Sequence, residues 1–235
     1  MQNINNTISF GGSRQFLREA DWVCRKVKSE FPMISPTHVY YSNPERILNN
    51  KNYMEFLMNK SLQLQEDRAD RHFLKRGYKF LKEVLYSAAV HKVGNCSESV
   101  SLAEMIAKMN GVKNCYRLSF AEANPKRIMS VDSRNKLDHT VLMVSKNPVD
   151  QDGIKPSESL IIDPWLGISG RMRDIVTRYK NEFAKILKIN KDTSLAFKLS
   201  EPLDLNEYDI EILRLGYPEL IYKKKDKSAG FIRLA

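Results

Sequence analysis

The chain has 235 residues, and 38 Lys and Arg against 28 Asp and Glu give it a formal net charge of +10. Hydrophobic residues make up 42% of the chain and charged residues 28%, an ordinary balance for a globular protein that excludes wholesale disorder. No uncharged apolar run reaches about 18 residues, and the first residues lack a basic region followed by an apolar one. We therefore expect neither a membrane span nor a Sec-type signal.

The opening residues, 1–12, are polar and rich in asparagine, so we expect a flexible leader followed by one domain over residues 13–235. Residues 13–93 are predicted to be mainly helical, because apolar positions recur at helical spacing between charged ones. The predicted helices of this part run over 14–31, from Pro44 onward, and over 71–89.

The middle of the chain, residues 94–170, changes character. A helix is predicted over 95–109 with apolar or small residues on most faces, which is typical of a helix buried at the centre of a domain. Asn110-Gly111 is a fitting stop for that helix. Strand-like apolar runs follow at 114–120, 139–145 and 159–163.

The last part, residues 171–235, returns to helical spacing. A helix over 171–187 carries the apolar stripe Ile175, Tyr179, Phe183 and Ile186. A short strand at 195–199, a helix over 206–215 and the basic cluster Lys223–Lys227 complete the chain. The predicted class is therefore α+β, with a central helix packed on a small antiparallel sheet and extra helices at both ends.

Three cysteines, Cys24, Cys96 and Cys115, form an odd number without CxxC spacing, which argues against a disulfide framework or a zinc knuckle. We expect reduced thiols, no bound metal and no cofactor. Cys24 lies on an apolar helical stripe and is expected in the core. Cys115 could join other groups as a metal ligand, but the lack of locally paired ligands disfavours that alternative.

Cys96 is placed in the first turn of the predicted central helix. With Asn95 as N-cap, Glu98 is the N3 residue and completes a variant of the capping box. Free backbone N–H groups and the helix dipole then surround Cys96 and favour its thiolate. Gly94 allows a sharp turn and the close approach of a substrate. Considered alone, a buried structural cysteine remains the alternative.

His139 and Asp163 stand at the start and the end of two apolar strands. If these strands form a hairpin with its turn near Gln151, the two residues lie directly opposite each other on one face of the sheet. The carboxylate would accept from one imidazole nitrogen and leave the other to serve Cys96. The order Cys96, His139, Asp163 therefore indicates a catalytic triad.

The motifs that surround these three residues resemble the transglutaminase-like branch of the papain-like cysteine enzymes, over residues 94–165. They are Gly94-Asn95-Cys96-x-Glu98, Asp138-His139 and Ile161-Ile162-Asp163-Pro164-Trp165. The resemblance implies a papain-like or transglutaminase-like fold, with Cys96 as nucleophile, His139 as general base and acid, and Asp163 as the orienting carboxylate. Among the members of this group, the chain most resembles secreted bacterial effectors that deamidate or cross-link host glutamines. Cysteine proteases share the same arrangement of motifs.

Residues around the triad receive supporting roles. The Gln or Trp that often supplies an oxyanion donor in the family has no clear match, so the Cys96 backbone N–H and the Asn95 side chain are the candidate donors. Glu98 is expected to support the site as a capping residue. Gly94, Asp138 and Trp165 are the candidate substrate-binding residues, although Trp165 could equally fill the core.

The net charge lies outside the candidate site. Residues 94–170 hold nine basic and nine acidic side chains, whereas the flanking parts carry +6 and +4. This distribution favours a protein substrate of acidic character or an anionic membrane surface, with nucleic acid the less favoured partner. A basic nucleic-acid- or membrane-binding protein, or a catalytically inactive adaptor, is the alternative class. We expect a cytoplasmic location, in the producing cell or in a host reached by specialised secretion.

Overall fold

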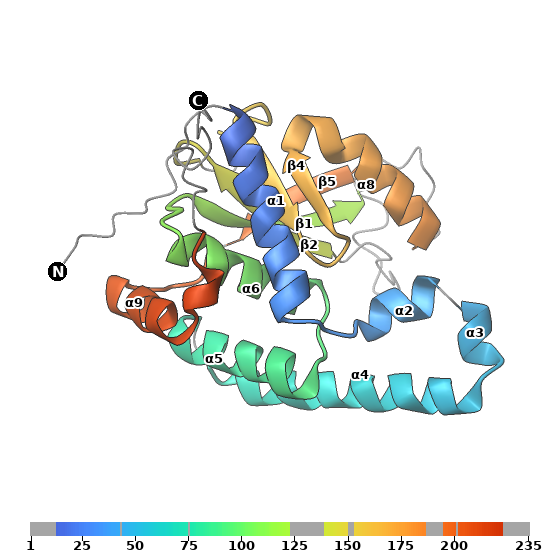
Figure 1. Cartoon of the computed structure of the whole chain (residues 1–235). Helices are drawn as coiled ribbons and strands as arrows, with labels where there is room; N and C mark the ends of the chain where they lie inside the picture. Colours follow the sequence, from blue (N-terminus) through green and yellow to red (C-terminus); the bar gives the residue numbers. More distant parts are fainter. Residues whose placement is uncertain are drawn as a thin grey trace, which may run out of the picture.

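A five-stranded antiparallel sheet forms the centre of the molecule, with strand order β4-β3-β2-β1-β5 (Figure 1). The computed structural model describes residues 13–42, 44–74, 76–122, 139–149, 153–186, 195–200 and 202–222. The strands are β1 Cys115–Glu122, β2 His139–Ser145, β3 Ser159–Asp163, β4 Ile168–Arg171 and β5 Leu195–Ser200. The predicted leader, Asp138 and the basic cluster Lys223–Lys227 lie outside the described residues.

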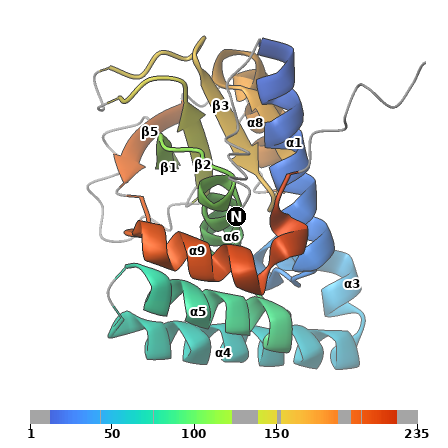
Figure 2. The same cartoon turned by 60° about the vertical axis from the view of Figure 1, so that its left-hand side comes forward.

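Helices cover both faces of this sheet. They are α1 Ser13–Glu30, α2 Pro36–Ser42, α3 Pro44–Leu48, α4 Lys51–His72, α5 Tyr78–Tyr86, α6 Cys96–Met109, α8 Met172–Ile186 and α9 Glu207–Gly216. A π-helical turn η1 at Ser87–His91 follows α5, and a 3-10 turn η2 at Pro218–Leu220 follows α9. Helices α1 and α6 lie on one face and α8 on the other, while α4, α5 and α9 lie outside α6 (Figure 2). The described chain is thus α+β, as predicted.

The two faces of the sheet have separate cores, because successive strand residues point to opposite sides. Leu142 and Leu160 pack with α1 and α6, whereas Val141, Met143 and Ile161 pack with α8. Burial on both faces explains why these strands appear in the sequence as continuous apolar runs.

Helix α6 is the buried central helix that the sequence predicts. Most of its residues are inaccessible to solvent, and it stops at Asn110 before Gly111, whose φ of 83° favours glycine. One charged side chain, Glu104, is fully buried in it and accepts hydrogen bonds from Arg117 of β1 and from the Leu203 backbone N–H. That ion pair joins α6 to the sheet.

The predicted helix over 71–89 is confirmed only from Tyr78 onward, where α5 and then η1 follow, because the chain breaks at Gly77 between α4 and α5. Gly77 has a φ of 138°, and a Cβ there would lie 2.8 Å from the Asp204 carbonyl oxygen. Strand β4 and most of α4 were not predicted. Only Leu57, Leu64, Asp67 and Arg71 are buried in the 22 residues of α4, so it lacks the apolar stripe that reveals a helix.

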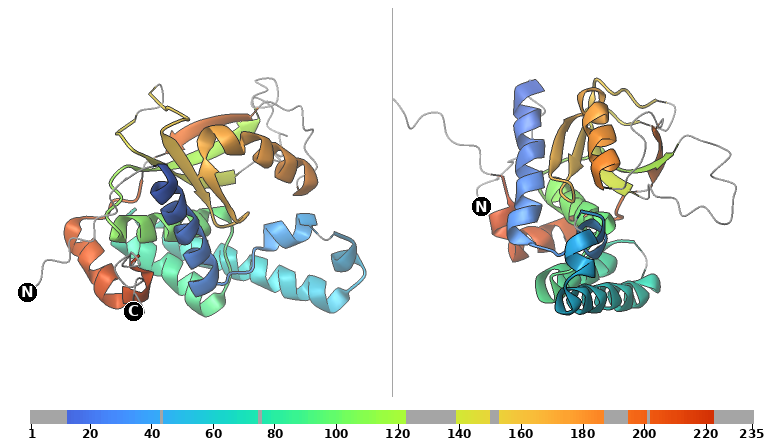
Figure 3. Two further views of the ribbon diagram at one scale, coloured as in Figure 1. Left: turned by 45° about the horizontal axis from the view of Figure 1, so that its top comes forward. Right: turned by 90° about the vertical axis from the view of Figure 1, so that its right-hand side faces the viewer.

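The first half of α4 projects from the body of the molecule together with α2 and α3 (Figure 3). This arm, residues 36–62, exposes several large apolar side chains, among them Tyr40, Leu48 and Met58. Among the described helices, none is both long and apolar enough to cross a bilayer.

Candidate active site

Cys96 is the first residue of α6, and Asn95 is the N-cap, as the sequence predicts. Both halves of the capping box are present, and the Asn95 backbone N–H donates to Glu98 Oε2 at 2.9 Å. The Cys96 thiol is partly exposed at the positive end of the helix dipole. The local sequence therefore presents this sulfur to the solvent at the start of α6.

His139 and Asp163 form a hydrogen-bonded pair, with 2.7 Å between Nε2 and Oδ2. The predicted register of their strands is wrong by two residues, because Leu142 pairs with Ile162, which would place Asp163 opposite Val141. A shift of two residues keeps every side chain on its predicted face. The pair therefore meets as diagonal neighbours, which a histidine is long enough to reach.

Asp163 is fully buried, and both of its carboxylate oxygens are engaged. Oδ2 also accepts from the Tyr179 hydroxyl at 3.0 Å, and Oδ1 accepts from the Leu166 backbone N–H at 3.1 Å. Burial, and secondly the charge of Asp163, raises the pKa of Tyr179 well above its usual value, so the Tyr179 hydroxyl stays a donor. Tyr179 appears in the sequence only as one residue of an apolar stripe, and nothing local distinguishes it.

His139 is held in an aromatic cage that leaves only 2% of it exposed. Its ring centroid lies 4.9 Å from that of Trp165 and 5.5 Å from that of Phe183. Burial lowers the pKa of His139, but the interactions with Asp163 and then with Cys96 outweigh it, and the pKa is raised overall. The protonated form of the imidazole is thus favoured between the Asp163 carboxylate and the Cys96 thiol.

Nδ1 is the ring nitrogen that remains for Cys96, because Nε2 is hydrogen-bonded to Asp163. Nδ1 is buried and meets no hydrogen-bond partner of standard geometry within the described residues, so it is the ring nitrogen available to the thiol. The arrangement links a thiol, an imidazole and a carboxylate in the order that proton transfer requires.

The other two thiols differ from that of Cys96. Cys24 and Cys115 are buried in the apolar core, as expected for Cys24. Burial, together with the nearby Asp163, raises the pKa of Cys24 to about 12, and burial also raises the pKa of Cys115. Over the described part of the chain, no group of three or more His, Cys, Asp and Glu side chains could hold a metal ion.

Glu98 supports the helix N-terminus through a buried ion cluster. It accepts from Arg68 at 2.9 and 3.1 Å and from Arg71 at 3.0 Å, besides the Asn95 backbone N–H. Burial opposes ionisation, yet Arg68 and Arg71 lower the pKa of Glu98 overall. Glu98 thus acts as the predicted capping residue, whereas the two arginines of α4 were not foreseen, since they lie about 30 residues away in the sequence.

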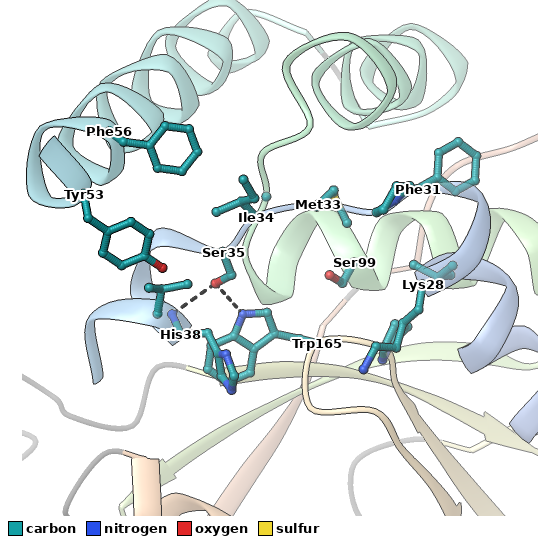
Figure 4. A pocket seen from close by; sticks show the side chains of 15 residues that line it. Lys28, Phe31, Met33, Ile34, Ser35, His38, Tyr53, Phe56, Ser99 and Trp165 are labelled. Atoms are coloured by element: carbon teal, nitrogen blue, oxygen red, sulfur yellow. Dashed lines mark hydrogen bonds between the residues drawn. The ribbon is translucent and has the colours of Figure 1, made fainter. Parts of the chain in front are cut away.

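Trp165 is tied to the N-terminus of α6 through Ser35, which sequence analysis missed. The indole Nε1–H donates to Ser35 Oγ at 2.7 Å (Figure 4). The Ser35 hydroxyl in turn donates to Asn95 Oδ1 at 2.6 Å. The Asn95 oxygen thus accepts hydrogen bonds from Ser35 and from the helix cap, and the NH₂ group of the same side chain is the candidate oxyanion donor. The backbone N–H of Cys96 is the better candidate.

Of the three predicted substrate-binding residues, two line a cavity beside the site and the third lies outside the described residues. Trp165 packs on His139 and lines a cavity together with Gly94. A Cβ on Gly94 would lie 2.9 Å from Glu98 Cβ, so the position has room only for glycine. Asp138 lies outside the described residues.

A comparison with protein-family models, with curated proteins and with solved structures finds no match to this chain.

Proposed function

We propose that the protein is a cysteine-dependent acyl-transfer enzyme that acts on a protein substrate through Cys96, His139 and Asp163. The observation that carries the proposal is the buried hydrogen bond between His139 and Asp163, together with the partly exposed Cys96 at a helix N-terminus, which helps to raise the pKa of His139. An ion pair with a purely structural role can also shift pKa values, but such a pair does not require a cysteine beside its histidine. The combination supports nucleophilic catalysis.

The proposed reaction has two steps. The Cys96 thiolate attacks an amide carbonyl, an S–C bond forms, and the C–N bond breaks as protonated His139 gives its proton to the leaving amine. Asp163 keeps the imidazole oriented throughout. Water activated by His139, or an amine, then attacks the thioester and releases Cys96. The Cys96 backbone N–H stabilises the oxyanion that develops in each step.

The motif resemblance extends this proposal to a papain-like or transglutaminase-like fold. Within that group, glutamine deamidation or transglutamination of a host protein by a secreted bacterial effector is the favoured activity, and proteolysis is the alternative. The basic flanking parts of the chain favour an acidic protein as substrate.

Thiol labelling tests the nucleophile. We expect iodoacetamide to modify Cys96 in the folded protein much faster than Cys24 or Cys115, since both of those are buried. His139→Ala should slow the labelling of Cys96, because the imidazole no longer supports the thiolate. Equal rates in the two proteins would contradict the pairing and favour the inactive adaptor.

Mass spectrometry of candidate acidic proteins incubated with the enzyme identifies the reaction. An amide-to-acid change, a cross-link or a cleavage selects deamidation, transglutamination or proteolysis respectively. Cys96→Ala is the matched control and should abolish each product while changing the free energy of unfolding by no more than about 1–2 kcal/mol. A product that survives this substitution would overturn the proposal.

A further inference from the structure

A cavity of about 610 Å³ lies beside the candidate triad and is not used by the chemistry described above. Its walls come from α1, the α1–α2 connection, α2, α4, α6 and the turn after β3 (Figure 4). This volume is in the range of sites that enclose a ligand group rather than a water molecule.

The cavity is adjacent to the reacting groups, because its walls include chain neighbours of two of them. Gly94 and Ser99 lie on either side of Cys96 in the sequence and both line the cavity. Pro164 and Trp165, which also line it, follow Asp163 directly, and the Trp165 ring packs against His139. A substrate bound at Cys96 can therefore extend into this space.

The lining is predominantly apolar. It comprises Val27, Lys28, Phe31, Pro32, Met33, Ile34, Ser35, His38, Val39, Tyr53, Phe56, Gly94, Ser99, Pro164 and Trp165. The Ser35 hydroxyl is occupied by Trp165 and Asn95. Burial, and secondly the positive charge of Lys28, lowers the pKa of His38, which favours the neutral form of His38 at neutral pH. Lys28 is the lining residue with a permanent charge, and it disfavours a cationic guest.

We propose that this cavity binds a large apolar side chain of the protein substrate that adjoins the amide attacked by Cys96. The inference rests on the proposed function and adds the substrate class to it. An aromatic or long aliphatic side chain would be removed from water against Phe31, Met33 and Phe56, while the apolar walls offer a charged side chain little compensation.

Three iodoacetamides of graded chemistry test the cavity without knowledge of the natural substrate. They are iodoacetamide itself, its N-(4-phenylbutyl) derivative and its N-(6-aminohexyl) derivative, which is cationic. Each alkylates Cys96 by the same step, in which the S–C bond forms and iodide leaves. We expect the phenylbutyl probe to label Cys96 about tenfold faster than iodoacetamide, and the aminohexyl probe to gain nothing.

Two variants change the cavity without touching the triad. Phe56→Ala removes an aromatic wall that is 41% exposed, so the fold should tolerate it. Val39→Trp fills the space from α2. Both should reduce the advantage of the phenylbutyl probe severalfold and leave the iodoacetamide rate unchanged. Phe73→Ala, which removes an 88% exposed phenylalanine outside the cavity, is the matched control and should change neither rate.

The outcomes separate the two proposals. Slow labelling of Cys96 by iodoacetamide would contradict the proposed function itself. The cavity proposal alone would be overturned if iodoacetamide labels Cys96 fast but the phenylbutyl probe labels it no faster. It would also be overturned if the phenylbutyl probe is faster but keeps its full rate advantage in both cavity variants. An equal advantage for the aminohexyl probe would show that probe length, rather than apolar character, determines the rate, and would also refute it.

Discussion

Removal of the Glu98 side chain is expected to be among the most damaging single changes to the fold. Glu98→Ala deletes the acceptor for Arg68, Arg71 and the Asn95 backbone N–H at the start of α6. The carboxylate is only 2% exposed, so water cannot replace it as the partner of these donors without a rearrangement.

The magnitude follows from the unequal exposure of the two arginines. The Arg71 side chain is 4% exposed and would become an unpaired buried charge, whereas that of Arg68 is 45% exposed and can turn toward solvent. Loss of one partner from a buried pair costs about 3–5 kcal/mol. Glu98→Gln keeps an acceptor for the capping box but not the charge, so we expect a smaller loss of about 1–3 kcal/mol.

Urea unfolding at neutral pH measures both free energies, with Glu66→Ala as the control. Glu66 lies on α4, the helix that carries Arg68 and Arg71, but it is exposed, and its loss should change stability by less than about 0.5 kcal/mol. Because Arg68 and Arg71 lower the pKa of Glu98, its contribution is fully present above the pKa of the unfolded chain. That contribution decreases as the pH falls toward the lower pKa of the folded state.

A double-mutant cycle completes the test. Arg71→Met combined with Glu98→Gln should cost less than the sum of the two single changes, by about 0.5–3 kcal/mol, because the groups interact directly. If Glu98→Ala costs under about 1 kcal/mol, or if the two changes are additive, the description of a coupled ion cluster around buried Glu98 is wrong.

Three further changes probe the surroundings of the triad. Ser35→Ala removes the acceptor of the Trp165 indole N–H and should cost about 1–3 kcal/mol in urea unfolding; an unchanged midpoint would refute the bridge. Tyr179→Phe deletes the hydroxyl that donates to buried Asp163 and should cost about 1.5–3 kcal/mol, and a neutral result would mean that this hydrogen bond contributes nothing. Because the pKa of His139 is raised in the folded protein, its contribution to stability is present below the unfolded pKa and is lost as the pH rises toward the folded value. Asp163→Asn should therefore flatten the decline of stability above neutral pH, and identical pH profiles would contradict the assignment.

Local sequence patterns were sufficient to place much of the candidate site. The capping box of Asn95 and Glu98, the bounds of β2 and β3, and the shared sheet face of His139 and Asp163 all follow from residue spacing. Each depends on interactions within a few residues or on the two-residue period of a strand, which a single sequence displays directly.

The remaining features depend on contacts between distant segments. The register of β2 and β3 is set by the connection between them and by packing on both faces, so counting from an assumed turn missed it by two residues. Tyr179, Ser35 and Arg71 reach the site from α8, the α1–α2 connection and α4, and each looks locally like a core, loop or surface residue. The amino-acid order alone thus indicates the candidate residues Cys96, His139 and Asp163, because helix caps and strand periods are local. The hydrogen-bond partners of those residues and of their neighbours emerge only when separate elements pack together, since such long-range contacts leave no periodic trace in the sequence.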